Sequence, residues 1–222
     1  MLAGCLIGDN DNLQDVGIFR VTGSDQKIRE LEIHLSQGNF NFLRSKPDSH
    51  TITNYWKRLL RSMKDPLIPY NFYDEFLWEA DIERERSEFN NPNVKLIFTL
   101  LKLKFWINKL PQIHFDTLKF HINVFKMIVK HEPLNKMTAY NVAITVGPNI
   151  FRPRRTRPED ITNVGSYYEL IIQMIQQYDI LFNREQDYIE IIQNSKDDNG
   201  QFLSSNLNAD IGVGISNLDK LK

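Results

Sequence analysis

The sequence has a single cysteine, Cys5, among its 222 residues. One cysteine excludes an intramolecular disulfide framework and a zinc site built on cysteine ligands. An excess of either charge is also absent, since 27 lysine and arginine residues face 28 aspartate and glutamate residues and leave a formal net charge of −1. No overall field therefore directs the chain to nucleic acid or to a membrane, and we expect no nucleic-acid partner. Any electrostatic function must come from local clusters of charge.

Long hydrophobic runs are missing as well. The most apolar stretch, from Ile97 to Ile107, is interrupted by Lys102 and Lys104 and is too short to span a bilayer. The N-terminus lacks the charged start and apolar run of a signal peptide. Together with the low cysteine content, these features predict a soluble protein of the cytoplasm.

Several kinds of catalytic site are also unsupported. The phosphate-binding motif Gly-x-x-x-x-Gly-Lys-Ser/Thr does not occur, so the chain does not resemble a nucleotide hydrolase. No serine or cysteine lies in a nucleophile-elbow pattern. His114 and His121 lie seven residues apart on one predicted helix, with Asp116 between them, whereas a metal site would need closer pairing and further ligands. We therefore expect no metal site and no cofactor.

Hydrophobic residues recur at helical spacing almost throughout. Ile28, Leu31 and Leu35 form one stripe, in a helix capped by Ser24 or Asp25 and stopped at Gly38. No segment shows the sustained alternation of a strand flanked by hairpin turns. The fold class predicted is all-α, a multi-helix bundle. Further helices are predicted over residues 52–63, 71–80, 93–109, 111–130, from Thr138 to Gly147-Pro148, and over 167–182.

The composition changes after about residue 185. Residues 194–222 are rich in Ser, Asn, Asp and Gly, and they contain one aromatic residue, Phe202. Such a segment buries too little apolar surface to offset the entropy of ordering. We predict a lead-in over residues 1–12, one domain over 13–184, and a polar, largely disordered tail over 185–222.

One arginine lies in a short loop between two glycines. The loop runs from Gly17 through Ile18, Phe19 and Arg20 to Gly23, and the next helix begins after it. An arginine in such a loop can present its planar guanidinium to a phosphate. It can equally be an ordinary surface residue, so it needs support from the rest of the chain.

Two predicted helices offer such support. Lys57, Arg61 and Lys64 recur at i, i+4, i+7, a spacing at which like charges repel and do not stabilise a helix. They form either a solvated face, a stripe for an anionic partner, or a brace for a neighbouring loop. Asn141 lies early in the helix after Thr138, where an asparagine amide competes for backbone groups. It either caps that helix or takes part in binding.

The strongest local run of charge lies in the segment 151–158. It contains Arg152, Arg154, Arg155 and Arg157. The segment is either a solvated loop between helices or a basic patch that contacts anionic lipid, where each basic residue contributes about 1 kcal/mol.

Three ordered blocks of this sequence resemble the signatures of the Rho-family GTPase-activating (RhoGAP) domains. The first is the loop Gly17 to Gly23, which looks like the arginine-finger loop of that family. The second is the segment 56–61, followed by 65–69 with Pro66 and Pro69. The third runs from Asn135 through Asn141 to Gly147-Pro148-Asn149. The resemblance covers roughly residues 13–184, and three blocks in family order are more specific than any one alone.

The resemblance implies a function in trans. Such a domain is not an enzyme itself but completes the active site of a Rho/Rac/Cdc42-type small GTPase in its GTP-bound state. Arg20 would be the arginine finger, Arg61 would mainly hold the finger loop, Lys57 would contact the GTPase, and Asn141 would bond at the same interface. GTP and Mg²⁺ would belong to the partner. Pro148 would shape the end of its helix.

Two features depart from the family. Members usually have another helix and a proline-containing lead-in before the finger loop, whereas sixteen residues precede Gly17 here, with a predicted turn over 9–12. We therefore expect a truncated lead-in. Lys64-Asp65 also replaces the Pro-Glu that often precedes Pro66. Two functions remain: an active GTPase activator, or a catalytically weak module that docks a GTPase or an anionic membrane. The expected location is the cytoplasm, either with or without recruitment to a membrane.

Overall fold

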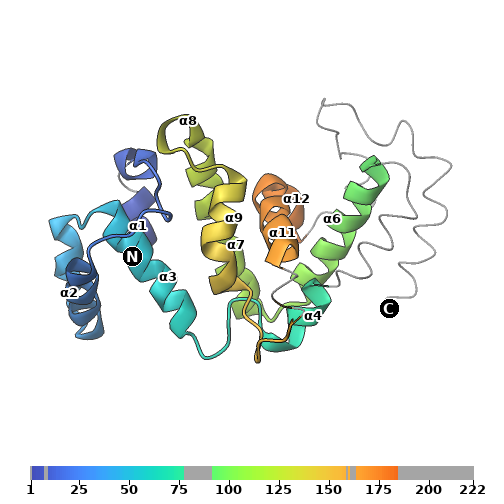
Figure 1. Cartoon of the computed structure of the whole chain (residues 1–222), viewed down its shortest axis with the longest axis horizontal. Coiled ribbons are helices and arrows are strands. Elements are labelled where there is room, and N and C mark those ends of the chain that lie inside the picture. Colours follow the sequence, from blue (N-terminus) through green and yellow to red (C-terminus); the bar gives the residue numbers. More distant parts are fainter. Residues whose placement is uncertain (1, 8–9, 78–91, 159, 161–163, 185–222) are drawn as a thin grey trace. The chain divides into compact units, whose positions relative to one another are not determined.

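The computed structural model describes residues 2–7, 10–77, 92–158, 160 and 164–184, and every regular element in these ranges is a helix (Figure 1). The all-α prediction is confirmed. The predicted disordered tail, 185–222, lies outside the described residues, and the boundary of a domain over 13–184 stays a prediction. The elements are α1 (Leu2–Ile7), η1 (Asn10–Gln14), α2 (Asp25–Ser36), η2 (Phe40–Ser45), α3 (Ser49–Ser62), η3 (Tyr70–Phe72), α4 (Tyr73–Phe76), α6 (Pro92–Lys109), α7 (Gln112–Lys130), α8 (Glu132–Asn135), α9 (Ala139–Ile150), α11 (Val164–Gln176) and α12 (Tyr178–Leu181).

The described residues belong to two compact units. The first combines the described residues of the ranges 2–74 and 111–178, and the second combines those of 75–110 and 179–184. In the first unit, α9 packs against α3, α7 and α11, and α3 also contacts α1 and α2. Its core is formed by fully buried side chains such as Phe19, Ile52, Phe125 and Val142. The three motif blocks of the sequence all fall in this unit.

In the second unit, one buried lysine joins α6 to α12 and to the residues that follow it. Lys104 is 1% exposed, and its ammonium donates hydrogen bonds to the carbonyls of Ile180 at 2.7 Å and Asn183 at 2.6 Å. Burial lowers the pKa of this ammonium. A buried charge is tolerated only when it is hydrogen-bonded, and these two carbonyls meet that need. Lys104 therefore has a structural role.

Several predicted boundaries differ from the structure. The helix predicted over 71–80 consists of η3 and α4, which ends at Phe76, and residues 78–80 lie outside the described residues. The helix predicted over 167–182 is divided at Gln177 into α11 and α12.

The turn predicted over residues 9–12 overlaps η1, and α1 precedes it. The helix predicted to end at Gly147-Pro148 continues to Ile150, with Pro148 inside its last turn. Proline removes one helical N–H, the partner of the Ile144 carbonyl. Because Pro148 and Ile144 both lie on the exposed side, water can bond that carbonyl, and the helix continues.

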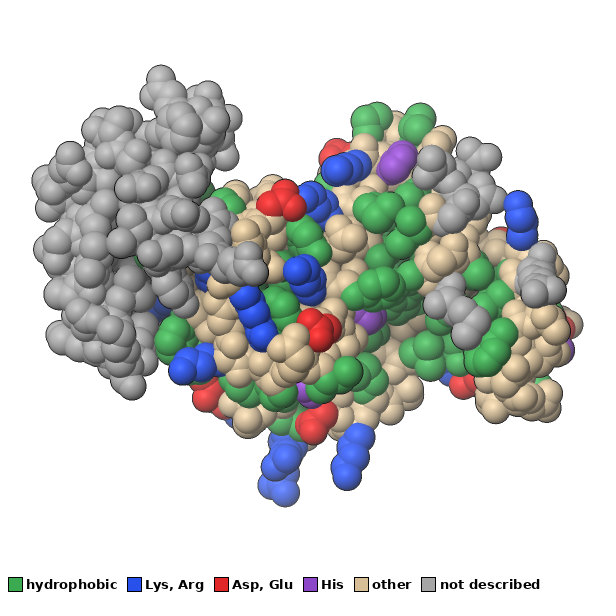
Figure 2. Space-filling model, turned by 180° about the vertical axis from the view of Figure 1, so that it is seen from behind, with side chains coloured by type: hydrophobic (Ala, Val, Ile, Leu, Met, Phe, Trp, Pro, Cys, Tyr) green, Lys and Arg blue, Asp and Glu red, His purple; other side chains and the backbone are tan. Residues whose placement is uncertain are grey.

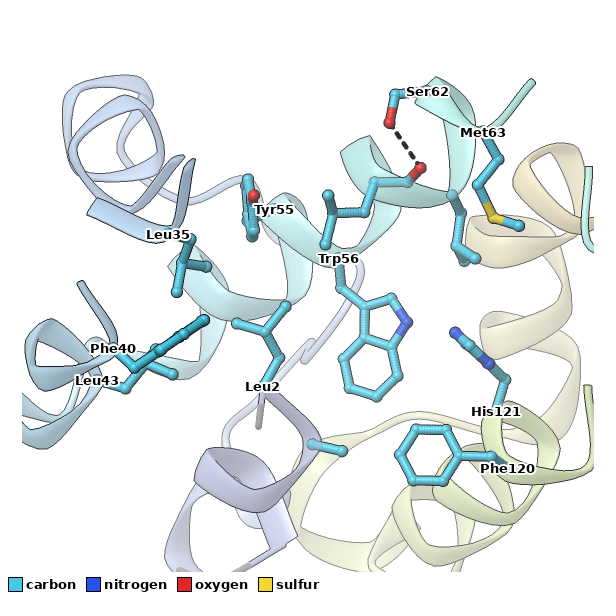
Figure 3. Close-up of a pocket in the computed structure, with 13 residues that line it drawn as sticks. Leu2, Leu35, Phe40, Leu43, Tyr55, Trp56, Ser62, Met63, Phe120 and His121 are labelled. Atoms are coloured by element: carbon cyan, nitrogen blue, oxygen red, sulfur yellow. Dashed lines mark hydrogen bonds between the residues drawn. The ribbon is translucent and has the colours of Figure 1, made fainter. Parts of the chain in front are cut away.

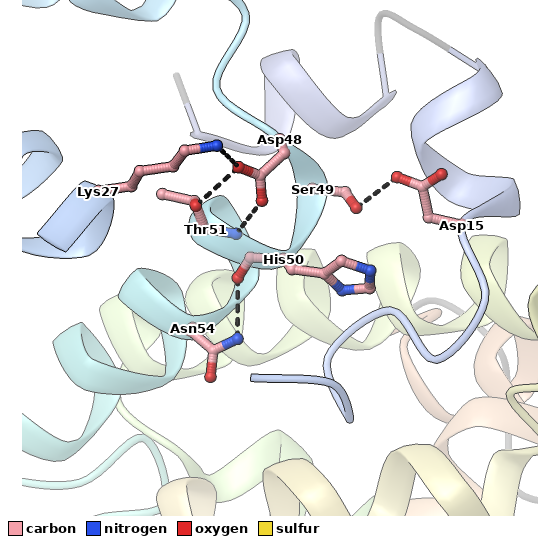
Figure 4. Close-up of polar contacts among 7 residues, drawn as sticks. All are labelled: Asp15, Lys27, Asp48, Ser49, His50, Thr51 and Asn54. Carbon is pink, nitrogen blue, oxygen red and sulfur yellow. Dashed lines mark hydrogen bonds and ion pairs between the residues drawn. The ribbon is translucent and has the colours of Figure 1, made fainter. Parts of the chain in front are cut away.

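Asp48 fixes the start of α3, the helix that carries Lys57 and Arg61. Its carboxylate accepts hydrogen bonds from the Thr51 backbone N–H at 2.8 Å and the Thr51 hydroxyl at 3.0 Å, and it pairs with Lys27 at 3.2 Å (Figure 4). Partial burial alone would raise the pKa of Asp48, but the hydrogen bonds from Thr51 and the charge of Lys27 outweigh it and hold the pKa below its ordinary value.

Replacing Asp48 by alanine is expected to lower the free energy of unfolding by about 1 to 2 kcal/mol at neutral pH, because the first turn of α3 loses its cap. A carboxyl whose pKa is lowered on folding stabilises the protein above its unfolded-state pKa of about 3.9, and this contribution disappears as pH falls through the folded-state pKa. Denaturant unfolding of both proteins at neutral and acidic pH measures the effect. Asp65→Ala, which removes an exposed aspartate, serves as the control. If Asp48→Ala lowered the free energy of unfolding equally at neutral and acidic pH, the role of the ionised Asp48 carboxylate as a cap would be contradicted.

Candidate functional site

The loop that carries Arg20 is a tight turn closed by its own backbone. The amides of Arg20 and Val21 both donate to the Gly17 carbonyl at 2.8 Å. Gly17 has a φ of +73°, and a Cβ atom there would lie 2.7 Å from the Val21 side chain. Only glycine combines this left-handed backbone with the missing side chain. The first glycine of the motif is therefore required by the geometry of the turn.

Phe19 anchors the loop in the core of the first unit. Its side chain is completely buried and meets the rings of Trp56 and Phe125 edge to face, with centroids 5.8 and 5.4 Å apart. Its φ of +66° is unusual for a residue with a side chain and costs about 1 kcal/mol or more. Burial of the ring between two aromatic partners stabilises this backbone. The inward side chain of Phe19 leaves the next residue, Arg20, at the surface.

Arg20 is exposed, and within the described part of the chain its guanidinium has no hydrogen bond or ion pair. The guanidinium lies beside Gly17, since a Cβ atom on that glycine would come within 3.6 Å of Nη2. An arginine whose five N–H donors are not used internally can present them to an anion of another molecule.

Lys57 fixes the loop at its centre. Its ammonium donates a hydrogen bond of 2.5 Å to the carbonyl of Phe19, the residue before Arg20. Burial, and then the charge of Arg61, lower the pKa of Lys57. Arg61 is exposed, and its side chain has no hydrogen bond or ion pair with a described residue. The role of holding the loop, expected for Arg61, thus falls to Lys57 in the structure.

The same helix also fixes the far end of the loop. The Asn54 amide donates to the carbonyls of Val21 at 2.9 Å and His50 at 2.8 Å, and Figure 4 shows the second of these bonds. Gly23 then passes the start of α3 so closely that a Cβ atom would lie 2.9 Å from the backbone of His50 and Thr51. The second glycine of the motif is needed for this close approach.

A buried asparagine fixes the beginning of the loop. The Gly17 amide donates to the carbonyl of Asn135 at 2.8 Å. The Asn135 side chain, 0% exposed, donates to the carbonyls of Leu13 and Ile128 and accepts from the Met137 amide, each at 2.8 Å. The side-chain amide of Asn135 thus joins three segments: the residues before the loop, the end of α7, and the residues that precede α9. Neither Asn135 nor Phe19 was singled out as a site residue from the sequence, although both stand in its motif blocks.

Asn141 lies beside this connection. Its backbone amide caps α9 by donating to the Thr138 hydroxyl at 3.0 Å, and its side-chain amide donates to the Lys136 carbonyl at 3.1 Å. Lys136 follows Asn135, so Asn141 is two hydrogen-bonded steps from Gly17. The Asn141 side-chain oxygen has no hydrogen-bond donor among the described residues, so it remains available to a partner.

The four arginines of the predicted basic patch have different environments. Arg152 is half-buried and donates to the carbonyls of Arg61 and Met63 at the end of α3. Arg157 pairs with Asp74 at 2.6 Å and with Asp160 at 3.1 Å, and hydrogen bonds to these two carboxylates raise its pKa. Both guanidinium groups therefore have partners within the described part of the chain.

The other two are exposed and have no carboxylate partner among the described residues. Arg154 lies over the ring of Tyr70 at 5.4 Å, and Arg155 has no contact of this kind with a described residue. On the face shown in Figure 2, lysine and arginine side chains are scattered among acidic and apolar ones. A lipid contact through this segment stays a prediction, with Arg154 and Arg155 as its exposed charges.

In the part of the chain that the structure describes, no group of three or more His, Cys, Asp or Glu side chains is arranged to hold a metal ion. None of the described helices is both long enough and apolar enough to cross a membrane.

Comparison with known proteins supports the motif blocks. A family model for the RhoGAP domain matches residues 5–155, which include Arg20, Lys57, Arg61 and Asn141. Rho GTPase-activating protein gacN of Dictyostelium discoideum is 30% identical over 172 residues, which make up 77% of this chain and 26% of that protein. Rho GTPase-activating protein 24 of Mus musculus is 29% identical over 174 residues, 78% of this chain and 22% of that protein. The chain thus spans about a quarter of the length of these relatives.

Solved structures show the same helical fold. The crystal structure of human Rho GTPase activating protein 15 aligns with a TM-score of 0.69 at 22% identity and covers 82% of each chain. The BH domain from Graf, the GTPase regulator associated with focal adhesion kinase, aligns with a TM-score of 0.65 at 20% identity over 82% of this chain and 92% of that one. With the family model matched over all three motif blocks, this chain belongs to the RhoGAP domain family.

Proposed function

We propose that this domain activates a Rho-family small GTPase by inserting Arg20 into the nucleotide site of the GTP-bound partner. One observation carries the proposal: Arg20 is exposed and unpaired among the described residues, on a loop whose neighbouring residues are all fixed. A surface arginine without function would not need such support. The names of the relatives, which are Rho GTPase-activating proteins, agree with this partner class.

Arg20 would act on the charge that develops during GTP hydrolysis. As the bond to the γ-phosphoryl group breaks, negative charge grows on the leaving oxygen and on the transferred group, and a guanidinium supplied in trans stabilises it. When Ras is joined by its own activating protein, the rate of hydrolysis rises about 10⁵-fold, equivalent to roughly 7 kcal/mol. GTP and Mg²⁺ would be supplied by the partner, and this chain would supply the arginine.

The fixed loop would make the arginine effective. Donors that are already in place when charge develops lose no energy to reorganisation. Lys57 holds the carbonyl before Arg20, Asn135 holds the amide of Gly17, and Phe19 anchors the turn in the core. Arg61, with its exposed side chain, and Asn141, with its free oxygen, would meet the GTPase surface.

Replacing Lys57 by methionine is expected to lower the stimulated rate of GTP hydrolysis about 10- to 100-fold, because a hydrogen bond from a charged group contributes about 1.5 to 3 kcal/mol. Methionine keeps the length and the apolar stem of lysine but cannot bond the Phe19 carbonyl. Single-turnover phosphate release, with the GTPase loaded with GTP, measures the effect. Lys64→Met, which removes an exposed lysine near the end of the same helix, should leave the rate within twofold or so.

The proposal is tested by mixing the wild-type domain with a panel of GTP-loaded Rho-family GTPases and following single-turnover phosphate release. Acceleration of at least one member is expected. If the domain binds a GTP-loaded member and accelerates none, the function is that of a docking module. Binding to anionic vesicles that is lost in an Arg154→Ala, Arg155→Ala double variant would support the predicted membrane contact.

A further inference from the structure

An apolar groove of about 560 Å³ lies in the first unit (Figure 3). Its walls come from α1, α2, η2, α3 and α7 and are mainly leucine and aromatic side chains, and no charged side chain among the described residues lines it. Its volume lies within the range of about 300 to 1,000 Å³ that is typical of small-molecule sites. The groove is separate from Arg20, whose side chain does not line it.

Two polar groups at the inner end of the groove lack hydrogen-bond partners among the described residues. His121 directs Nδ1 to the Thr117 carbonyl at 2.6 Å, so this nitrogen carries the hydrogen and Nε2 keeps a lone pair. The Trp56 indole carries an N–H donor, and in Figure 3 its nitrogen and the His121 ring face one another. Neither the indole N–H nor Nε2 of His121 has a hydrogen-bond partner among the described residues. Burial lowers the pKa of His121, against the opposing effect of the Thr117 carbonyl, and this favours the neutral ring.

The two groups define the chemistry of an occupant. A hydroxyl or amide can accept from the indole N–H and donate to the imidazole nitrogen at once. A carboxylate or phosphate would lose its hydration without meeting a cation in the groove, at a large cost. Trp56 and His121 are only 4% and 8% exposed, so a flat protein surface would cover the groove without reaching them. We infer that the groove binds a small apolar molecule that carries one neutral hydroxyl or amide group.

An occupant would also be close to the finger loop. The ring of Trp56 that lines the groove packs against Phe19, and Phe19 is adjacent to Arg20. A bound molecule that shifts Trp56 would therefore change the support of the loop. This consequence rests on the proposed function: the stimulated GTPase rate should change when the groove is filled, whereas binding itself needs no GTPase.

The test uses 1-naphthol as the probe and 1-methoxynaphthalene as its matched analogue, which keeps the apolar rings and loses the O–H donor. Binding is followed through the indole N–H signal of Trp56 in nitrogen-15 NMR spectra of the whole chain. Saturable shifts of this signal are expected for 1-naphthol, with affinity about fivefold higher than for the ether, as one hydrogen bond implies. His121→Phe should remove this preference.

His131→Phe is the matched control, because His131 makes the same kind of bond to the carbonyl four residues before it and does not line the groove. This variant should keep the preference for 1-naphthol. If His121→Phe does not fold, Ala3→Leu provides a second variant, since it fills part of the groove and should weaken both probes. Equal binding of the two probes in the wild type, or shifts confined to other regions, would overturn the inference. Burial of the groove between two copies of the chain, detected as a dimer by sedimentation, would overturn it too.

Discussion

Replacing Arg20 by alanine is expected to lower the stimulated rate of GTP hydrolysis by about 10³-fold or more, the range that an arginine supplied in trans contributes. The loss should appear in the rate constant at saturating domain, because the guanidinium interacts most strongly with charge that develops in the transition state. Affinity for the GTP-bound partner should change little, since Lys57, Asn135 and Phe19 keep the loop in place. Single-turnover phosphate release over a range of domain concentrations separates the two effects.

The matched control is Arg155→Ala, which removes one exposed arginine in the 151–158 segment. It should leave hydrolysis unchanged. Arg20→Lys should recover only part of the rate, because an ammonium lacks the planar set of donors. An Arg20→Ala protein with full activity would show that another group stabilises the transition state. Loss of folding in Arg20→Ala would mean that the arginine is structural, which its exposure argues against.

Replacing Asn135 by alanine is expected to lower the free energy of unfolding by about 3 kcal/mol or more. Two buried backbone groups, the carbonyl of Leu13 and the amide of Met137, would lose their partner, and the carbonyl of Ile128 would keep only the His131 amide. Each buried polar group left unpaired costs about 1 to 3 kcal/mol. Denaturant unfolding followed by circular dichroism measures the difference in the free energy of unfolding, provided that this free energy depends on denaturant concentration with the same slope in both proteins.

The control for this change is Asn123→Ala on α7, where the asparagine is exposed and has no hydrogen bond with a described residue. Its effect should stay within about 0.5 kcal/mol. In Asn135→Ala that remains folded under mild conditions, the stimulated GTPase rate should also fall, because side-chain bonds no longer hold in place the carbonyl of residue 135, which accepts from the Gly17 amide. A change in stability as small as that of the control would show that water replaces the side chain without loss.

The helices could be predicted from the sequence because their signals are local. The stripe of Ile28 and Leu31 and the cap at Ser24 are read within a few residues, and α2 lies where they predicted. The end of α9 was predicted wrongly, because the tolerance of Pro148 depends on which side of the helix faces solvent. That orientation is fixed by packing against α3, α7 and α11.

Parts of the site were beyond local patterns. The spacing of Lys57 and Arg61 shows that both lie near one face of α3, but not which one reaches the finger loop. Asn135 bonds Leu13, a residue 122 positions away, so no nearby residue signals its role. Phe19 could have been identified from the sequence, because it is a large apolar residue in a loop bounded by glycines. Loops usually lie at the surface, so such a residue suggests that its side chain is buried to anchor the loop.

The share of charge that the arginines of residues 151–158 offer to a partner also depends on contacts outside the local sequence. From the sequence, this run, with Arg152 and Arg157 in it, is either a solvated loop or a basic patch. Their partners come from distant segments: the end of α3 for Arg152, and Asp74 together with the nearby Asp160 for Arg157. The sequence therefore shows how many arginines lie close together along the chain. How many of their side chains remain free to bind a partner depends on the fold.

The most direct test of the central role of Arg20 is the affinity of the domain for the GTPase loaded with GDP and aluminium fluoride, which imitates the phosphoryl group during transfer. If Arg20 stabilises the transition state, Arg20→Ala should bind this complex about 100-fold or more weakly than wild type, because transition-state analogues report interactions made in the transition state. Its affinity for the partner loaded with a non-hydrolysable GTP analogue should change only a few-fold. Equal affinities of both proteins for the aluminium fluoride complex would contradict the account.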